Sequence, residues 1–117
     1  MMICYMKEDI AELKDHEGQY FMPHALFDTM QYKLIRLEVK WAYVACLNAL
    51  LKSPSYNKEG KAFIKDDNPQ IIAILKDLAN KMVDQEKING YILEMEDSGL
   101  IEKVGRDIYL KKICHIF

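Results

Sequence analysis

The sequence is poor in cysteine, with only Cys4, Cys46 and Cys114, and none of them forms a Cys-x-x-Cys pair. An odd number without that spacing argues against a secreted disulfide scaffold and against a structural zinc site. The first six residues are followed at once by three charged residues, so no apolar signal-peptide segment is predicted. A reducing cytoplasm is the simplest expected location for such a chain.

The sequence also lacks a long hydrophobic run and any recognisable catalytic motif. Its most apolar stretch, residues 41–51, is shorter than the roughly 20 residues of a membrane span and contains Asn48. His16, His24 and His115 have no partner at metal-ligand spacing. No nucleophile with a base, phosphate loop or cofactor motif is present. We therefore expect no enzyme activity, no metal, no cofactor and no membrane partner.

Excess positive charge is missing as well, because the formal net charge is -2. A strongly basic nucleic-acid binder is not indicated by this composition. The charge is uneven, however: residues 31–65 hold seven basic and two acidic residues, whereas residues 83–99 hold one lysine and five acids. Residues 100–117 hold four basic and two acidic residues. Any attraction for phosphate must come from residues 31–65 and the C-terminal segment.

What the sequence does contain is enough apolar residues for one globular domain. It has 117 residues, 50% hydrophobic and 29% charged, a size that buries a modest core without disulfides. Residues 37–52 are apolar nearly all the way round, which predicts a buried central helix that Pro54 ends. Residues 53–60 are predicted as a loop and 61–64 as a short strand. A short helical turn is expected near residues 25–28, after a short edge strand or staple at residues 19–23.

Two further helices have clear start signals. Asn68 is the expected N-cap of the first, with Pro69 at its first position, and the preceding Asp66 and Asp67 are interpreted as helix capping. The second helix is predicted to begin after the N-cap Asp84 and to end at residue 99, a glycine. Its expected core positions are those at helical spacing: Ile88, Tyr91 or Ile92, and Met95.

The last segment predicts a β-hairpin, because residues 100–104 and 107–112 alternate apolar and polar around Gly105–Arg106. The fold class expected from this order of elements is α+β, mostly α: a winged helix-turn-helix with a C-terminal β-hairpin wing. We assign it residues 20–117 and treat residues 1–19 as a partly ordered N-terminal arm. In this plan the core orients the last helix so that its outer face fits a DNA major groove about 12 Å wide.

Residues 23–43 contain the pattern Pro-x-Ala-Leu-Phe, then a tyrosine, then Leu-Glu-x-Lys-x-x-Tyr. A Glu-Gly before a short aromatic strand and a closing Gly-Leu-Ile follow. The matching residues are Pro23, Ala25, Leu26, Phe27, Tyr32, Leu37, Glu38, Lys40, Tyr43, Glu59, Gly60, Phe63, Gly99, Leu100 and Ile101. Over residues 20–112 the chain thus resembles the N-terminal domain of plasmid replication initiator protein A.

The resemblance implies a winged-helix DNA-binding domain that recognises repeated sites in a plasmid origin, often as a dimer, with host replication proteins recruited by other parts. Three features depart from the family pattern. Residues 52–61 lack the family's Leu-Ser and Asn-Gly-Trp, and the predicted recognition helix lacks the usual basic residues. The sequence also ends after the wing, so we expect an excised domain, a shortened gene product or a stand-alone relative.

The candidate DNA-binding residues lie on the predicted recognition helix, on the wing and in residues 58–65, before the helix that Asn68 is expected to cap. Glutamine and asparagine can bind adenine edges, and lysine and arginine can bind phosphates. The candidates are Gln85, Glu86, Lys87, Asn89, Lys103, Arg106, Lys111, Lys58, Lys61 and Lys65. The acidity of residues 83–99 leaves two alternatives open: a solvated face without a ligand, or a protein-interaction module that docks this acidic face on a basic DNA-processing partner.

Overall fold

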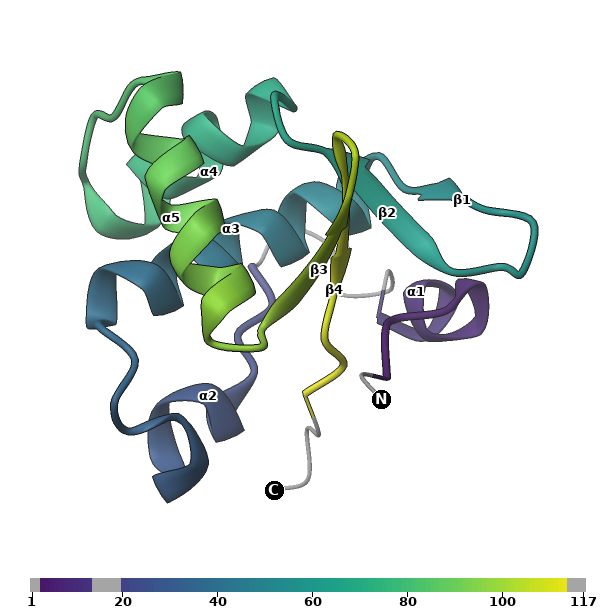
Figure 1. Cartoon of the computed structure of the whole chain (residues 1–117), viewed down its shortest axis with the longest axis horizontal. Coiled ribbons are helices and arrows are strands. Elements are labelled where there is room, and N and C mark those ends of the chain that lie inside the picture. Colours follow the sequence, from purple (N-terminus) through teal and green to yellow (C-terminus); the bar gives the residue numbers. More distant parts are fainter. Residues whose placement is uncertain (1–2, 14–19, 114–117) are drawn as a thin grey trace.

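The computed structural model describes residues 3–13 and 20–113, which form several helices and one small antiparallel sheet (Figure 1). In chain order the elements are α1 (Lys7–Leu13), α2 (His24–Asp28), the 3-10 helix η1 (Met30–Tyr32), α3 (Leu37–Lys52), β1 (Ser55–Tyr56), β2 (Ala62–Lys65), α4 (Pro69–Ala79), α5 (Gln85–Asp97), β3 (Ile101–Val104) and β4 (Asp107–Leu110). The four strands form one sheet in the order β1-β2-β4-β3.

α3 is the buried central helix that the sequence predicted, and its bounds are confirmed. Twelve of its 16 residues are buried, and it contacts α4, α5, β2 and β4. Figure 1 shows it crossing the middle of the molecule, between the α4–α5 pair and the sheet. Burial on nearly every side explains the absence of a polar stripe along the helix. No helix in the described part of the chain has the length and hydropathy of a membrane span.

One amide side chain in α3 ties the segment before α2 to the core. The buried Asn48 accepts a hydrogen bond at Oδ1 from the Phe21 N–H at 2.7 Å. Its Nδ2 donates to the carbonyl oxygens of Phe21 at 2.9 Å and Val44 at 2.8 Å. The short edge strand considered for residues 19–23 is not formed by residues 20–23. The Asn48 side chain forms the hydrogen bonds with the Phe21 backbone that a partner strand would otherwise form.

Both predicted helix starts, those of α4 and α5, are confirmed. The Asn68 side chain accepts from the Gln70 N–H at 2.9 Å, and the Asp84 side chain accepts from the Lys87 N–H at 2.9 Å. Each bond satisfies one of the backbone donors left free at a helix N-terminus. α4 ends at Asn80, which has left-handed backbone geometry with φ 50°. This conformation redirects the chain toward the start of α5.

The C-terminal hairpin is also confirmed, with β3 and β4 paired antiparallel around the Gly105–Arg106 turn. β4 pairs on its other side with β2, where Lys65 faces Asp107 in register. The order α3-β2-α4-α5-β3-β4, with β4 central, is consistent with a winged helix. The prediction of a pure loop at residues 53–60 was wrong, because Ser55–Tyr56 pairs with β2. Both residues of this strand are exposed, so they leave no apolar alternation to detect.

Residues 3–13, assigned from the sequence to an N-terminal arm, pack on the body of the protein. The Tyr5 N–H donates to the Leu110 carbonyl at 3.3 Å, and the Tyr5 carbonyl accepts from the Ala62 N–H at 3.0 Å. Tyr5 thereby lies between the diverging ends of β2 and β4. Its ring is fully buried, as is Ile10 of α1, and burial raises the pKa of Tyr5 to about 12.

We predict that Asn48→Ala destabilises the fold by about 2–4 kcal/mol, because it leaves the N–H and carbonyl of Phe21 without their partner. Urea unfolding followed by circular dichroism measures this change. Lys76→Ala, an exposed position on α4, is the control and is expected to change stability by less than about 0.5 kcal/mol. Equal stabilities for the two variants would contradict a structural role for Asn48.

Candidate nucleic-acid interface

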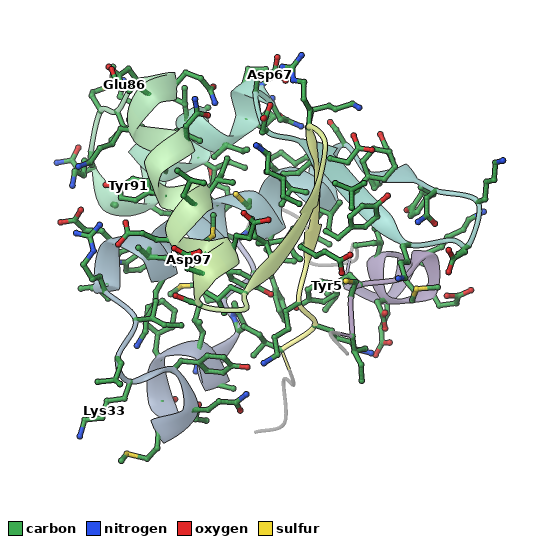
Figure 2. All side chains as sticks on the ribbon, in the orientation of Figure 1. Tyr5, Lys33, Asp67, Glu86, Tyr91 and Asp97 are labelled. Carbon is green, nitrogen blue, oxygen red and sulfur yellow. The ribbon has the colours of Figure 1, made fainter. Side chains whose placement is uncertain are left out.

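α5 has one face in the core and one in solvent. Its buried residues are those expected from helical spacing: Ile88, Tyr91, Ile92 and Met95. Its exposed face, apart from the acidic C-terminal end, carries Glu86, Lys87, Asn89, Gly90 and Leu93. In Figure 2, Glu86 marks the N-terminal end of this helix and Asp97 its C-terminal end, with Tyr91 between them. The helix is thus held by the core while most of its outer surface stays accessible.

Gln85 connects the start of α5 to the start of α4. Its Nε2 donates to the Asp66 carbonyl oxygen and to the Asn89 Oδ1, both at 2.9 Å. Gln85 is half-buried, whereas Asn89 is exposed. Of the two amides proposed as base readers, Gln85 therefore orients its neighbour and Asn89 is the more accessible.

The wing cations lie next to the same end of α5, but carboxylates neutralise them. Arg106 Nε lies 3.3 Å from Asp66 Oδ1, and its Nη2 is paired with Asp67. Lys103 Nζ lies 3.5 Å from Asp66 Oδ2. The two aspartates, chiefly Asp67, raise the pKa of Arg106. We name this group of four side chains the wing cluster.

The interpretation of Asp66 and Asp67 as helix caps was wrong, because Asn68 alone among these three side chains accepts from the first turn of α4. The two aspartates bind the wing instead, across about 40 residues of sequence. On the adjacent strands, Lys65 Nζ lies 2.5 Å from Asp107 Oδ1. Nothing local in the sequence distinguishes a capping aspartate from one that pairs with a distant arginine.

The other predicted phosphate-binding lysines do not join the wing cluster. Lys58 and Lys61 belong to the connection between β1 and β2, which projects on the opposite side of the sheet from α5 (Figure 1). Lys111 follows β4, and its Nζ lies 5.1 Å from the ring centroid of Tyr32. Lys103 and Arg106 are the predicted wing cations that contact Asp66, whose carbonyl oxygen binds Gln85 at the start of α5, whereas Lys65 is paired with Asp107.

A second ion cluster, which sequence reasoning missed, lines the far side of α5. Arg36 forms two hydrogen bonds with Glu94, at 3.0 Å from Nε and 2.6 Å from Nη2. Glu38 Oε2 lies 3.2 Å from Lys81 Nζ and accepts from the Tyr91 hydroxyl at 3.1 Å. Lys81 is the main cause of the lowered pKa of Glu38, and Arg36 is the main cause of the lowered pKa of Glu94. Arg36, which opens α3, thus fixes the side of α5 instead of pointing outward.

The free charge left on α5 is negative. Within residues 3–13 and 20–113, Glu86, Glu96 and Asp97 form no ion pair. Lys87 is the single basic residue of the helix, and its Nζ lies 5.6 Å from the centroid of the Tyr91 ring. The exposed face of α5 is consequently an acidic surface with an amide, Asn89, near its N-terminal end.

Within residues 3–13 and 20–113, no group of three His, Cys, Asp or Glu side chains could hold a metal ion. His16, Cys114 and His115 lie outside those ranges. Cys46 is fully buried in α3, and burial raises its thiol pKa to about 12. It is a core residue, as its place in the apolar helix indicated.

Solved structures include chains with a similar fold. One is described as an MDR initiator, with a TM-score of 0.57 and 21% identity over 88% of this chain and 84% of that chain. Another is a Rep–DNA complex, with a TM-score of 0.57 and 21% identity over 89% and 82%. A third is the N-terminal domain of a DNA-binding protein, with a TM-score of 0.53 and 19% identity over 86% and 79%. No family model and no curated protein sequence matches the chain.

The Arg36–Glu94 pair predicts a pH-dependent contribution to stability. Because Arg36 lowers the pKa of Glu94 in the folded state, the pair stabilises the fold above the ordinary glutamate pKa of about 4.3. This contribution is lost as the pH falls through the lower folded-state value. Glu94→Gln should therefore lower the melting temperature by about 1–4 °C at pH 7, and this decrease should shrink steadily as the pH falls below about 4. A pH-independent decrease in calorimetry would show that the pair is not its cause.

Gly90 gives a second prediction, since it lies in the middle of α5 with no atom within 4 Å of where a Cβ would be. No other backbone approaches the helix closely enough to require a glycine at this position. Gly90→Ala should therefore stabilise the isolated domain by about 0.5–1 kcal/mol, through helix propensity and a less flexible unfolded chain. Urea unfolding measures this change. A destabilised variant would reveal strain at this position.

Proposed function

We propose that this chain is a DNA-binding winged-helix domain of a replication initiator, which recognises repeated sites in a plasmid origin and performs no catalysis. The observation that carries the proposal is the arrangement of α5. Its exposed first turns lie at the same end of the molecule as the tip of the β3–β4 hairpin, joined to it through Asp66. The likeness to a Rep–DNA complex supports the same role. The cytoplasm is the proposed location.

In this proposal α5 enters the major groove by its first two turns. Asn89 is exposed there and its amide matches the N6 and N7 pattern of adenine. Lys103 and Arg106 on the wing lie close enough to the same turns to reach the flanking phosphates. The acids Glu96 and Asp97 lie at the C-terminal end of α5, whereas the groove-binding turns lie at the end that Glu86 marks in Figure 2. Their position limits the repulsion that an acidic helix would otherwise suffer.

A homodimer is part of the proposal, because repeated origin sites suit a protein with two copies of the recognition helix. Two such helices would bind half-sites about one helical turn apart. The described surface carries apolar side chains with little cover near the start of α3, since Leu34 is 97% and Met30 77% exposed. Host replication proteins are further proposed partners, recruited by other parts of such an initiator.

The acidic surface of α5 favours a second candidate function, a protein-interaction module on the same fold. The face formed by Glu86, Glu96 and Asp97 would dock on a basic DNA-processing partner through charge complementarity. This candidate predicts loss of partner binding on charge reversal at Glu96, and no preference among DNA sequences. The DNA-binding proposal predicts a preference among DNA sequences and no loss of DNA binding on charge reversal at Glu96.

The test is a selection of bound duplexes from a randomised library, followed by titration of the enriched sequence at about 50 to 200 mM salt. We expect the enriched duplex to bind at least about tenfold more tightly than a scrambled one, and affinity to fall with salt as counterions are released. Asn89→Ala should cost about 1–3 kcal/mol of that discrimination. Light scattering of the complex measures how many copies bind.

Gln31→Ala is the matched control, since it removes an exposed amide from η1, far from the start of α5. It is expected to bind the enriched duplex as the unmodified chain does. The proposal is wrong if no sequence is enriched, or if Asn89→Ala and Gln31→Ala are indistinguishable. A chain that fails this test but binds a basic protein through Glu96 would establish the second candidate.

A further inference from the structure

The guanidinium at the tip of the wing is held by two carboxylates from another element. Arg106 contacts Asp66 at 3.3 Å and also pairs with Asp67, both immediately before α4. Its side chain is nevertheless 63% exposed, and that of Asp67 is 55% exposed. A cation that faces solvent at the end of a hairpin is placed to meet a polyanion, yet its charge is already balanced within the protein.

The backbone of the wing is anchored separately from this side chain. The Asp66 N–H donates to the Arg106 carbonyl oxygen at 2.9 Å. Lys65 and Asp107, the strand partners next to them, form an ion pair of their own. Release of the Arg106 guanidinium from the aspartates therefore needs only rotation of its side chain, while the hairpin stays in position.

We propose that Asp66 and Asp67 act as a latch on Arg106, which makes the wing's contact with a phosphate conditional and so suppresses binding to arbitrary DNA. This rests on the proposed function, and it specifies how binding at that surface is limited. Arg106 leaves the aspartates only where a duplex phosphate lies within its reach. The carboxylates that it leaves then face the same phosphate backbone and repel it.

The physical basis is the small energy of an exposed ion pair. Such pairs contribute little to stability, so transfer of Arg106 from carboxylate to phosphate has a low cost wherever other contacts fix the duplex. Non-specific binding has no such contacts and depends almost entirely on phosphate neutralisation. The latch therefore weakens non-specific binding more than specific binding, and raises the ratio between them.

The experiment compares the unmodified chain, Asp67→Asn and Asp66→Asn/Asp67→Asn for binding to a random-sequence duplex at about 50 mM salt and for elution from heparin. The double variant is expected to bind the random duplex about three- to tenfold more tightly and to elute later. Asp67→Asn should shift in the same direction by less. Circular dichroism shows that each variant is folded, and Asp67→Asn keeps the test valid if the half-buried Asp66 does not tolerate change.

Two controls isolate the latch from the general loss of negative charge. Glu102→Gln removes one charge from the same hairpin, at an exposed residue with no ion pair among residues 3–13 and 20–113, and should change affinity by less than Asp67→Asn. With Arg106→Gln present, Asp67→Asn should have no larger effect than Glu102→Gln, because only the general loss of one negative charge then remains. The latch is overturned if Asp67→Asn behaves like Glu102→Gln, or if the extra gain of Asp67→Asn over Glu102→Gln persists without Arg106.

The two proposals fail in different ways. Tighter, Arg106-dependent binding of random duplex and heparin by the aspartate variants, with no enriched sequence in the library selection, supports the latch and rejects origin recognition. An enriched sequence together with unchanged binding of the aspartate variants rejects the latch alone. Absence of binding to random duplex by every variant also rejects the latch, because no phosphate then competes with the aspartates for Arg106.

Discussion

The burial of α3 is the constraint on which the other elements depend. A helix with apolar side chains on nearly all sides cannot face water, so it must be covered by elements from distant parts of the sequence. α4, α5, β2 and β4 provide that cover, and residues 3–13 close the gap between the strands. Because each of these elements contacts the same helix, the angle of α5 to the hairpin follows from packing. The direction of its outer face is therefore set by the core.

The same burial requires partners for the polar groups that α3 places in the core. Asn48 satisfies both backbone groups of Phe21, and the Tyr43 hydroxyl donates to the Lys111 carbonyl at 2.5 Å. Burial raises the pKa of Tyr43 well above its ordinary value, so this phenol remains protonated and keeps donating. These bonds hold the segment before α2 and the end of β4 in place. A polar group without a partner at either position would cost more than the bond itself contributes.

Most of the fold could be predicted from the sequence because its signals are local. The apolar run of α3, the caps Asn68 and Asp84, and the alternation around Gly105 each depend on residues close in sequence. β1 and the conformation of residues 20–23 could not be predicted, since exposed residues or a distant amide determine them. The helix and the hairpin that carry the candidate site could be predicted from the sequence, but the ion pairs of the site could not. The partners of Arg36 and Arg106 are separated from them by tens of residues, and no periodicity marks such pairs.

These long-range pairs change what the acidic composition of α5 means. The sequence alone suggests a conflict between a groove-binding helix and its five nearby carboxylates. In the folded chain Glu94 pairs with Arg36, so it does not oppose a phosphate as a free charge, and the Asp84 carboxylate is hydrogen-bonded to the first turn of the helix. The cations of the wing are balanced in the same way. A surface with so little free positive charge gains little from counterion release on arbitrary DNA. Under the proposed function, tight binding there depends on fitted contacts such as that of Asn89 and, under the latch proposal, that of Arg106. Weak binding to DNA in general would then follow from the internal ion pairs of this surface.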